Sequence, residues 1–385
     1  MMSRRSRAGR PVASVLVAGL ALLFAAGGLS CASAPVAASV PPVPPTSFTV
    51  VATGDVLLHQ KGSLVRGAAR TGEANGTAYD FTGVFAAVAP VIRGADLAIC
   101  HLETPVAPPE GPFRGYPSFA VQPQIVHALA DAGYDSCSTA SNHSFDDGFD
   151  GLVRTLDTLD AAGVAHTGTS RSAAQRDVPR IVEVHGVRVA QLSWTYGLNG
   201  IALPPAQEWS VNVFDAARAD VTGMLEEAAR ARQAGAEVVI ASVHCCTEYD
   251  HDPSDAQLTV AQALLASPDI DLVLGHHAHV VQPFERIAGK WVAYGLGNHV
   301  AQQNTPGGTR DSVIARFTFT RDADGRFTIT RAEAVPTRID VADDGVRVVP
   351  TAARVDPADA ASYDRVVEAL QLRGAVQDGL VVTGG

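Results

Sequence analysis

Side chains of the types that bind metal ions come directly after several short apolar runs of this chain. We predict a ligand set at these positions: Asp55, Glu103, Asn142, His244, His277 and His279. Carboxylates can bridge and balance two divalent cations, an amide adds a neutral oxygen, and imidazoles hold such ions selectively. The residue types therefore predict a two-metal site with open positions for a water nucleophile, which suits phosphoryl-type hydrolysis.

The segment 276–279 is the most informative part of this pattern. It reads His-His-Ala-His, and three imidazoles in four residues rarely serve packing alone. In a strand-like segment or a tight turn, His277 and His279 can point to one side. Taken singly, the other residues have ordinary alternatives: a turn or cap for Asp55, a solvated loop carboxylate for Glu103, an Asx turn for Asn142 and a core histidine for His244.

The apolar runs alternate with amphipathic stretches, so the chain is predicted to be an α/β protein. Strands are expected at 48–53, 97–100, 134–140, 238–243, 270–274 and 291–294. Helices are expected at 149–159, 216–234, 256–266 and 357–372. Two hairpins, 181–193 and 312–330, indicate mixed rather than purely parallel sheets. In such folds ligands bind at the carboxyl ends of strands, where the candidate residues lie.

The N-terminus has the order of an export signal. Arginines crowd residues 4–10, and residues 11–29 are apolar and without charge. Cys31 is preceded by Gly28-Leu29-Ser30, which resembles a lipoprotein cleavage site. Cleavage after Ala38 and an uncleaved membrane anchor are the alternatives.

The sequence divides into a signal or anchor at 1–31, a Pro- and Ala-rich linker at 32–47, a main domain at 48–345 and an extension at 346–385. The formal net charge of −11 argues against a nucleic-acid partner. An exported protein could form one or two disulfides from Cys100, Cys137, Cys245 and Cys246, with the pairing open. The sequence has no G-x-S-x-G, Walker or G-x-G-x-x-G motif, which disfavours serine hydrolase, P-loop and Rossmann functions.

Six motifs in this order resemble the bacterial capsule synthesis protein CapA (PgsA) family. They are Thr53-Gly54-Asp55, Leu102-Glu103-Thr104-Pro105, Ala140 to Ser144, His244 with Glu248-Tyr249, Gly275 to His279, and Tyr294 to Asn298. The resemblance implies a calcineurin-like metallophosphatase fold, a four-layered α/β/β/α sandwich with mixed sheets. It also implies a role in making or exporting a poly-γ-glutamate capsule at the outer face of the cell membrane.

The resemblance also assigns roles to individual residues. Asp55 and His279 would bind a first metal, Glu103 would bridge, and Asn142, His244 and His277 would bind a second. His143 would protonate the leaving oxygen or steady its charge. His276, Glu248 and Asn298 would lie around the ligands. The D-x-H motif of the wider superfamily is absent, because Asp55 is followed by Val56-Leu57, and His59 is expected to point elsewhere.

We expect one or two divalent ions, with Mn, Fe and Zn fitting the ligands equally well. Expected partners are the membrane, capsule or polyglutamate synthase subunits, and an anionic polymer or phosphoester substrate. The alternatives are an exported metal-dependent phosphoesterase without a capsule role and a non-catalytic scaffold with the same fold. A secreted protein is the alternative to a membrane-held one.

Overall fold

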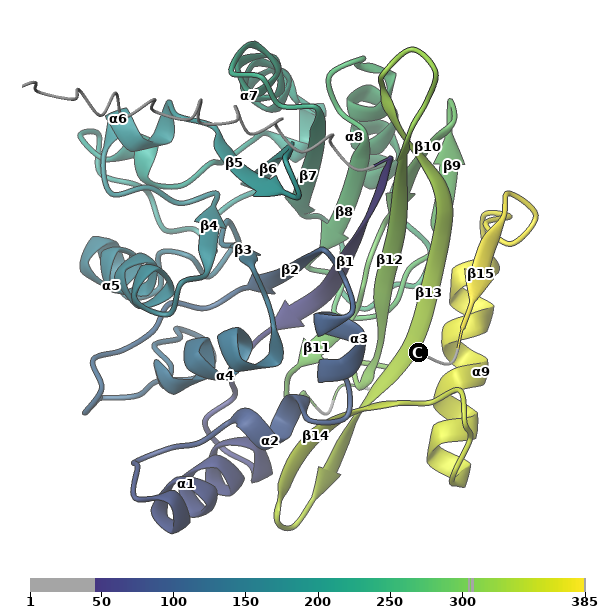
Figure 1. Ribbon diagram of the computed structural model, residues 1–385. Helices are drawn as coiled ribbons and strands as arrows, with labels where there is room; N and C mark the ends of the chain where they lie inside the picture. Colours follow the sequence, from purple (N-terminus) through teal and green to yellow (C-terminus); the bar gives the residue numbers. More distant parts are fainter. Residues whose placement is uncertain (1–45, 304, 306–307, 384–385) are drawn as a thin grey trace, which may run out of the picture. The chain divides into compact units, whose positions relative to one another are not determined.

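The computed structural model describes residues 46–303, 305 and 308–383 (Figure 1). The predicted signal or anchor, Cys31 and nearly all of the predicted linker lie outside these residues. Within the described part of the chain, no helix is both long and apolar enough to cross a bilayer.

The first sheet has the strand order β14-β13-β12-β1-β2-β3-β4, with β11 beside β1 and β15 beside β13. The strand β1 is parallel to β2, and β2 is parallel to β3, whereas β12, β13 and β14 run antiparallel. The bounds are β1 Ser47–Val56, β2 Leu97–Leu102, β3 Ser136–Ser138, β4 Ala165–Thr167, β11 Asn298–Val300, β12 Asp311–Arg321, β13 Phe327–Ala342, β14 Gly345–Pro350 and β15 Leu380–Val382.

The second sheet has the order β5-β6-β7-β8-β10-β9. Its central strands β6, β7, β8 and β10 are parallel, and hairpins close both edges. The bounds are β5 Arg180–Val184, β6 Val187–Thr195, β7 Val238–His244, β8 Leu272–His276, β9 Phe284–Ile287 and β10 Lys290–Ala293. Both sheets are therefore mixed, as predicted.

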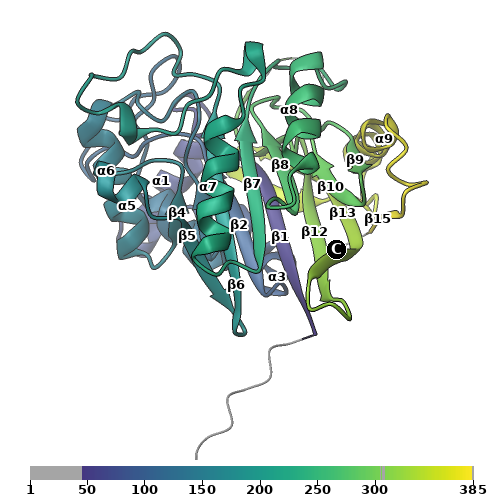
Figure 2. The ribbon, with the colours of Figure 1, turned by 90° about the horizontal axis from the view of Figure 1, so that it is seen from above.

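The helices fall into groups that cover different faces (Figures 1 and 2). Those against the first sheet are α1 Ser63–Asn75, α2 Thr82–Phe85, α3 Ala89–Arg93, α4 Gln124–Ala132 and α5 Gly148–Ala161. Those against the second sheet are α7 Thr222–Gln233 and α8 Asp255–Ala266. The remaining helices are α6 Ala173–Arg176, α9 Pro357–Gln371 and the short 3₁₀ turns Glu208–Ser210 and Ala216–Arg218.

Three apolar cores define four layers. On β2, Ala98 and Cys100 pack with α4 and α5, while Leu97 and Ile99 face the second sheet, because alternate strand residues point to opposite faces. The second sheet likewise turns Ile240 towards the first sheet and its alternate residues towards α7 and α8. The α/β/β/α order that the resemblance implied is confirmed.

Some elements differ from the sequence predictions. The helix expected at 216–234 is interrupted, because Ala219 has a left-handed φ of 48° and α7 begins only at Thr222. The helices α1 and α4 and the short strands β4, β9, β11 and β15 were not predicted. Residues 345–350 and 380–382 both pair with β13, so strands from the end of the chain extend the first sheet. The division at residue 345 stays a prediction.

Candidate metal centre

The candidate ligands meet where parallel strands of both sheets end. Asp55 lies near the end of β1 and Glu103 directly follows β2, while His244 and His276 are the last residues of β7 and β8. Asn142 lies four residues after β3. The sequence argument that strand ends would gather these side chains is thus met by the topology.

Asp55, Glu103 and His279 form the carboxylate half of the centre. Their ligand atoms lie within 4.8 Å of one another, and all three side chains are buried. His279 Nδ1 is 3.1 Å from Asp55 Oδ2, and His279 Nε2 is 3.9 Å from Glu103 Oε1. Both carboxylate oxygens of Glu103 and Oδ1 of Asp55 are buried without a hydrogen-bond partner among the described residues. Buried charges of this kind normally have a partner, so the arrangement fits a cation.

Asn142, His244 and His277 form the imidazole half. His244 Nε2 lies 2.9 Å from Asn142 Oδ1, and the rings of His244 and His277 are 4.7 Å apart. Asn142 Nδ2 donates to Asn199 Oδ1 over 3.2 Å, which fixes the amide with its oxygen towards His244. His277 Nδ1 is buried and has no hydrogen-bond partner among the described residues. Asn142 and His244 are thus in direct contact, and the ring of His277 packs beside that of His244.

The turn 276–279 holds both halves together through an unusual backbone. His277 and His279 have φ values of 86° and 57°, a region that residues with a side chain rarely adopt. The backbone N–H of His277 points to Asp55 Oδ2 at 3.3 Å. Strained backbone of this kind is typical of functional sites.

Asn298, at the start of β11, orients His279. His279 Nδ1 lies 2.9 Å from Asn298 Oδ1 and also faces Asp55 Oδ2. Since both neighbours are acceptors, Nδ1 carries a proton and donates it. The other nitrogen, Nε2, is turned towards Glu103 and Glu248.

The pKa values of Glu103 and His279 are raised in the carboxylate half, and those of the two histidines are lowered in the imidazole half. Burial raises the pKa of Glu103 to about 7 against the opposing influence of His279. Burial would lower the pKa of His279, but Glu103 and Asp55 outweigh it and raise that pKa to about 9. Burial and the neighbouring imidazoles lower the pKa of His277 to about 3 and hold that of His244 well below its ordinary value.

The predicted acid residue, His143, lies beside the ligands at a cavity of about 700 Å³. Its Nδ1 is 2.7 Å from Asp146 Oδ2, and its ring meets the edge of Phe119 at 4.8 Å. Burial disfavours the charged ring, but the hydrogen bond to Asp146 and the nearby Glu103 raise the pKa of His143. The ring of His143 therefore holds its proton more tightly than a free imidazole does.

The three predicted surrounding residues take different positions. Asn298 contacts His279 as described, and Glu248 lies on the cavity wall with Oε1 3.9 Å from His277 Nδ1 and 4.0 Å from His279 Nε2. The ligand atoms of Glu248, His277 and His279 could also hold an ion. His276 is buried with both ring nitrogens unpartnered among the described residues, and its Nδ1 is 3.4 Å from Asp55 Oδ1.

His101 and Asn199 belong to the site but were not predicted. His101 is fully buried, and its ligand atom groups with those of Asp55 and His276. The period of two in β2 places His101 in phase with Leu97 and Ile99, which would have shown that it faces the second sheet. Asn199 lies on a loop with φ 51°, and no local pattern marks it. His59, expected to point elsewhere, lines the cavity but joins none of the ligand groups.

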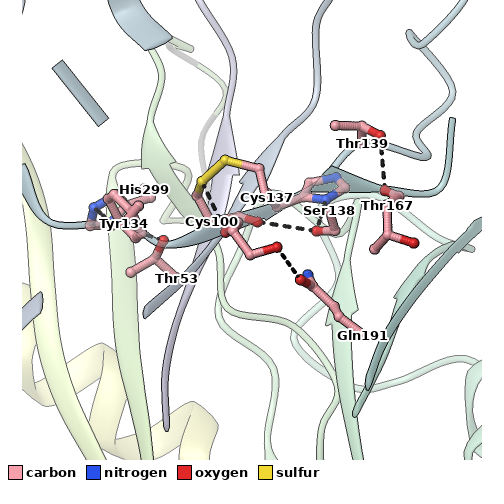
Figure 3. The surroundings of a disulfide bond; sticks show 11 residues. Thr53, Cys100, Tyr134, Cys137, Ser138, Thr139, Thr167, Gln191 and His299 are labelled. Atoms are coloured by element: carbon pink, nitrogen blue, oxygen red, sulfur yellow. Dashed lines mark hydrogen bonds between the residues drawn. A yellow bond between two sulfur atoms is a disulfide. The ribbon is translucent and has the colours of Figure 1, made fainter. Parts of the chain in front are cut away.

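The four cysteines left open by the sequence form two pairs, Cys100–Cys137 and Cys245–Cys246. Figure 3 shows the first, which links β2 to β3 between the polar clusters around Tyr134 and Ser138. The strands it joins lead directly to Glu103 and to the loop that carries Asn142.

Fold and site together define a class: a two-sheet α/β/β/α sandwich with a buried carboxylate and imidazole cluster at the ends of its parallel strands. The model of the family described as bacterial capsule synthesis protein PGA_cap matches residues 49–303, well over half of the chain. This chain belongs to that family, and the resemblance found in the sequence is confirmed.

Similar proteins have related descriptions. The PGA biosynthesis protein CapA of Bacillus subtilis (strain 168) is 30% identical over 254 residues, which cover 64% of this chain and 64% of that protein. The capsule biosynthesis protein CapA of Bacillus anthracis is 28% identical over 246 residues, covering 61% and 57%. The chain thus matches less than two thirds of the length of these relatives. The solved calcineurin-like phosphoesterase YfkN from Bacillus subtilis aligns at a TM-score of 0.43 and 15% identity, over 84% of this chain and 96% of that one.

Proposed function

We propose that this protein acts in the synthesis or export of a capsule polymer such as poly-γ-glutamate, through a cavity that holds one or two divalent metal ions. The metal site is supported by a set of buried atoms that have no hydrogen-bond partner among the described residues: Glu103 Oε1 and Oε2, Asp55 Oδ1 and His277 Nδ1. Their residues belong to two groups of possible metal ligands that share His279, and leaving such atoms without a cation is costly.

The donor set suits ions such as Mn, Fe or Zn. Glu103, Asp55 and His279 would hold one ion, and Asn142, His244 and His277 a second, with Glu103 between the two. Glu248 can add a carboxylate from the cavity wall, which offsets the absent D-x-H histidine. Bound ions of this kind polarise a substrate oxygen and activate water for hydrolysis or group transfer.

The charge of the cavity wall implies that an anionic substrate group would bind there only through a metal ion. Among the described residues that line the cavity there is no lysine or arginine, while Asp146 and Glu248 are acidic. A phosphate or carboxylate would be repelled unless cations at the base of the cavity reverse the local field. His143, hydrogen-bonded to Asp146, is placed to give a proton to a leaving oxygen.

The cellular setting is proposed from the sequence and the relatives. The basic and then apolar N-terminus favours export, with the domain held at the outer face of the membrane by a lipid on Cys31 or by an uncleaved anchor. Two relatives are described as biosynthesis proteins for PGA or for a capsule, which favours association with a polymer synthase. The substrate would be the polymer itself or a phosphoester.

Metal analysis of the purified full-length protein tests this proposal, together with turnover of phosphoesters and γ-glutamyl peptides. We expect bound divalent metal, and we expect folded His277→Ala and Asn142→Ala variants to lose the ion of the imidazole half, because each removes a donor from that ion. His185→Ala is a control, since His185 is an exposed histidine paired with Asp96.

A metal content in both variants equal to that of the unsubstituted protein would contradict the site. Metal loading without turnover of any substrate would favour the scaffold, and turnover of simple phosphoesters but not of γ-glutamyl substrates would favour the phosphoesterase.

A further inference from the structure

His101 is a buried histidine that the proposed metal site does not use. It lies at the end of β2, and its ring stacks on that of His276 with centroids 4.0 Å apart and planes 13° apart. Both ring nitrogens have partners: Nε2 is 2.9 Å from His244 Nδ1, and Nδ1 is 2.8 Å from Ser138 Oγ. His101 therefore connects a proposed metal ligand to the adjacent strand β3.

The direction of these hydrogen bonds follows from the last member of the chain. Ser138 Oγ donates to the carbonyl oxygen of Cys100 over 3.2 Å. A hydroxyl that has given its proton to a carbonyl can only accept from a ring nitrogen. The proton of His101 then lies on Nδ1, so its Nε2 accepts from His244 Nδ1.

This direction leaves Nε2 of His244 without a proton. Its nearest partner, Asn142 Oδ1 at 2.9 Å, is also an acceptor, because the amide nitrogen of Asn142 is bound to Asn199. Two acceptors this close repel each other unless a cation lies beside them, so this pair of atoms would suit a metal ion.

We propose that His101 is a positioning residue that holds His244 with Nε2 free to bind a metal ion beside Asn142. The inference rests on the metal site proposed above. Metal-binding histidines usually donate their second nitrogen to an acceptor that fixes the ring, and here the acceptor is a second imidazole. No change in net charge is needed, since both imidazoles stay neutral and each donates its one N–H to the next group along the chain from His244 to Ser138.

The strand pairing holds this chain in place. His101 and Ser138 are register partners in the parallel pair β2 and β3, and Cys100 and Cys137 just before them form the disulfide. Figure 3 shows Ser138 next to this disulfide, at the end of the paired strands. The serine is thereby kept opposite His101.

The test compares two substitutions at His101 in the full-length protein, with Zn²⁺ affinity measured against a chromophoric chelator. His101→Phe keeps the ring that stacks on His276 but removes the acceptor, and we expect about 10- to 100-fold weaker Zn²⁺ binding. His101→Gln returns an amide oxygen near the position of Nε2, and we expect affinity close to that of the unchanged protein. His166→Phe is the matched control, because His166 on β4 is also buried but pairs with Asp160 of α5.

Circular dichroism verifies that each variant folds, and ¹⁵N NMR of the Zn²⁺-loaded protein gives a second readout. We expect the Nδ1 of His244 to carry the proton. Unchanged affinity in His101→Phe, equal loss in His101→Phe and His166→Phe, or a proton on Nε2 of His244 would overturn the inference. If His277→Ala loses Zn²⁺ while His101→Phe keeps it, only this inference fails. An unchanged protein that binds no Zn²⁺ overturns the metal site and this inference together.

Discussion

The two halves of the candidate centre differ in how they hold protons. In the carboxylate half, burial of the Glu103 carboxyl raises its pKa to about 7, and the carboxylates of Glu103 and Asp55 raise the pKa of His279 to about 9. In the imidazole half, burial and the neighbouring rings lower the pKa of His277 to about 3. A cation entering the carboxylate half would therefore displace protons near neutral pH, whereas the rings of the imidazole half are already neutral.

This difference shows how one site can bind two ions with different strengths. A cation that enters the carboxylate half must displace a proton, whereas one that enters the imidazole half meets neutral nitrogens. The ligands of the imidazole half are all neutral, so the only negative charge shared with that half is the one on Glu103. Glu103 is thus the residue on which both halves depend.

The largest effect should come from Glu103→Gln. We expect metal affinity in both halves to fall by about 100-fold or more, because the bridging charge is lost. In the metal-free protein the same change should stabilise the fold at pH 8 by about 1 kcal/mol, since it removes an unpartnered buried charge. Calorimetric metal titration and thermal unfolding measure the two effects.

The sign of the stability effect follows from the raised pKa of Glu103. The folded protein binds this proton more tightly than the unfolded chain, so stability falls as the pH rises from the ordinary range of the carboxyl through about 7. The gain in Glu103→Gln should therefore vanish at pH 4. A variant that loses stability at pH 8 while keeping its metal would show that Glu103 has a structural role only.

A smaller effect is expected from Asn298→Ala, which acts on one half alone. Without the amide oxygen at Nδ1 the ring of His279 is held less firmly, and metal affinity in the carboxylate half should fall about 10- to 100-fold. The imidazole half should keep its affinity. Asn212→Ala is the control, because Asn212 is a buried asparagine that donates to Ser193 in a different region. An equal loss of metal affinity in both halves would show that they do not bind metal independently.

The metal affinities of the two halves should depend differently on pH, and their ratio should change by about 10-fold per pH unit. Between pH 7 and pH 9, His279 must release its proton before a metal can bind, so affinity in the carboxylate half should rise about 10-fold per pH unit and level off above about 9. The imidazole half should change little over this range, since His277 titrates near 3. If the affinities of the two bound ions changed with pH in the same way, the proposed difference between the halves would be wrong. Titration of Mn²⁺ at several pH values measures it.

Much of this centre could be predicted from sequence because the strands are short and strongly apolar. A run such as 238–243 indicates a buried strand, and the ligand that follows it must lie at the sheet edge. The break before α7 could not be predicted, since the left-handed turn at Ala219 interrupts an otherwise helical pattern. His101 was not predicted, because its place on the inner face of β2 becomes visible only when the alternation of side chains along the strand is considered. Asn199 comes from a loop whose position depends on contacts distant in sequence.

The pairing of the cysteines could not be predicted from the sequence either. Cys100 and Cys137 are 37 residues apart, and only the parallel register of β2 with β3 places them opposite each other. The same register brings His101 to Ser138. Short-range patterns predict the elements, but the neighbours of each strand depend on the whole fold.

The most direct test of the central claim is anomalous diffraction from crystals of the protein soaked in Mn²⁺. We predict one peak among Asp55, Glu103 and His279 and another among Asn142, His244 and His277. Anomalous density only at the surface, with none among these side chains in a well-ordered crystal at pH 8, would contradict it.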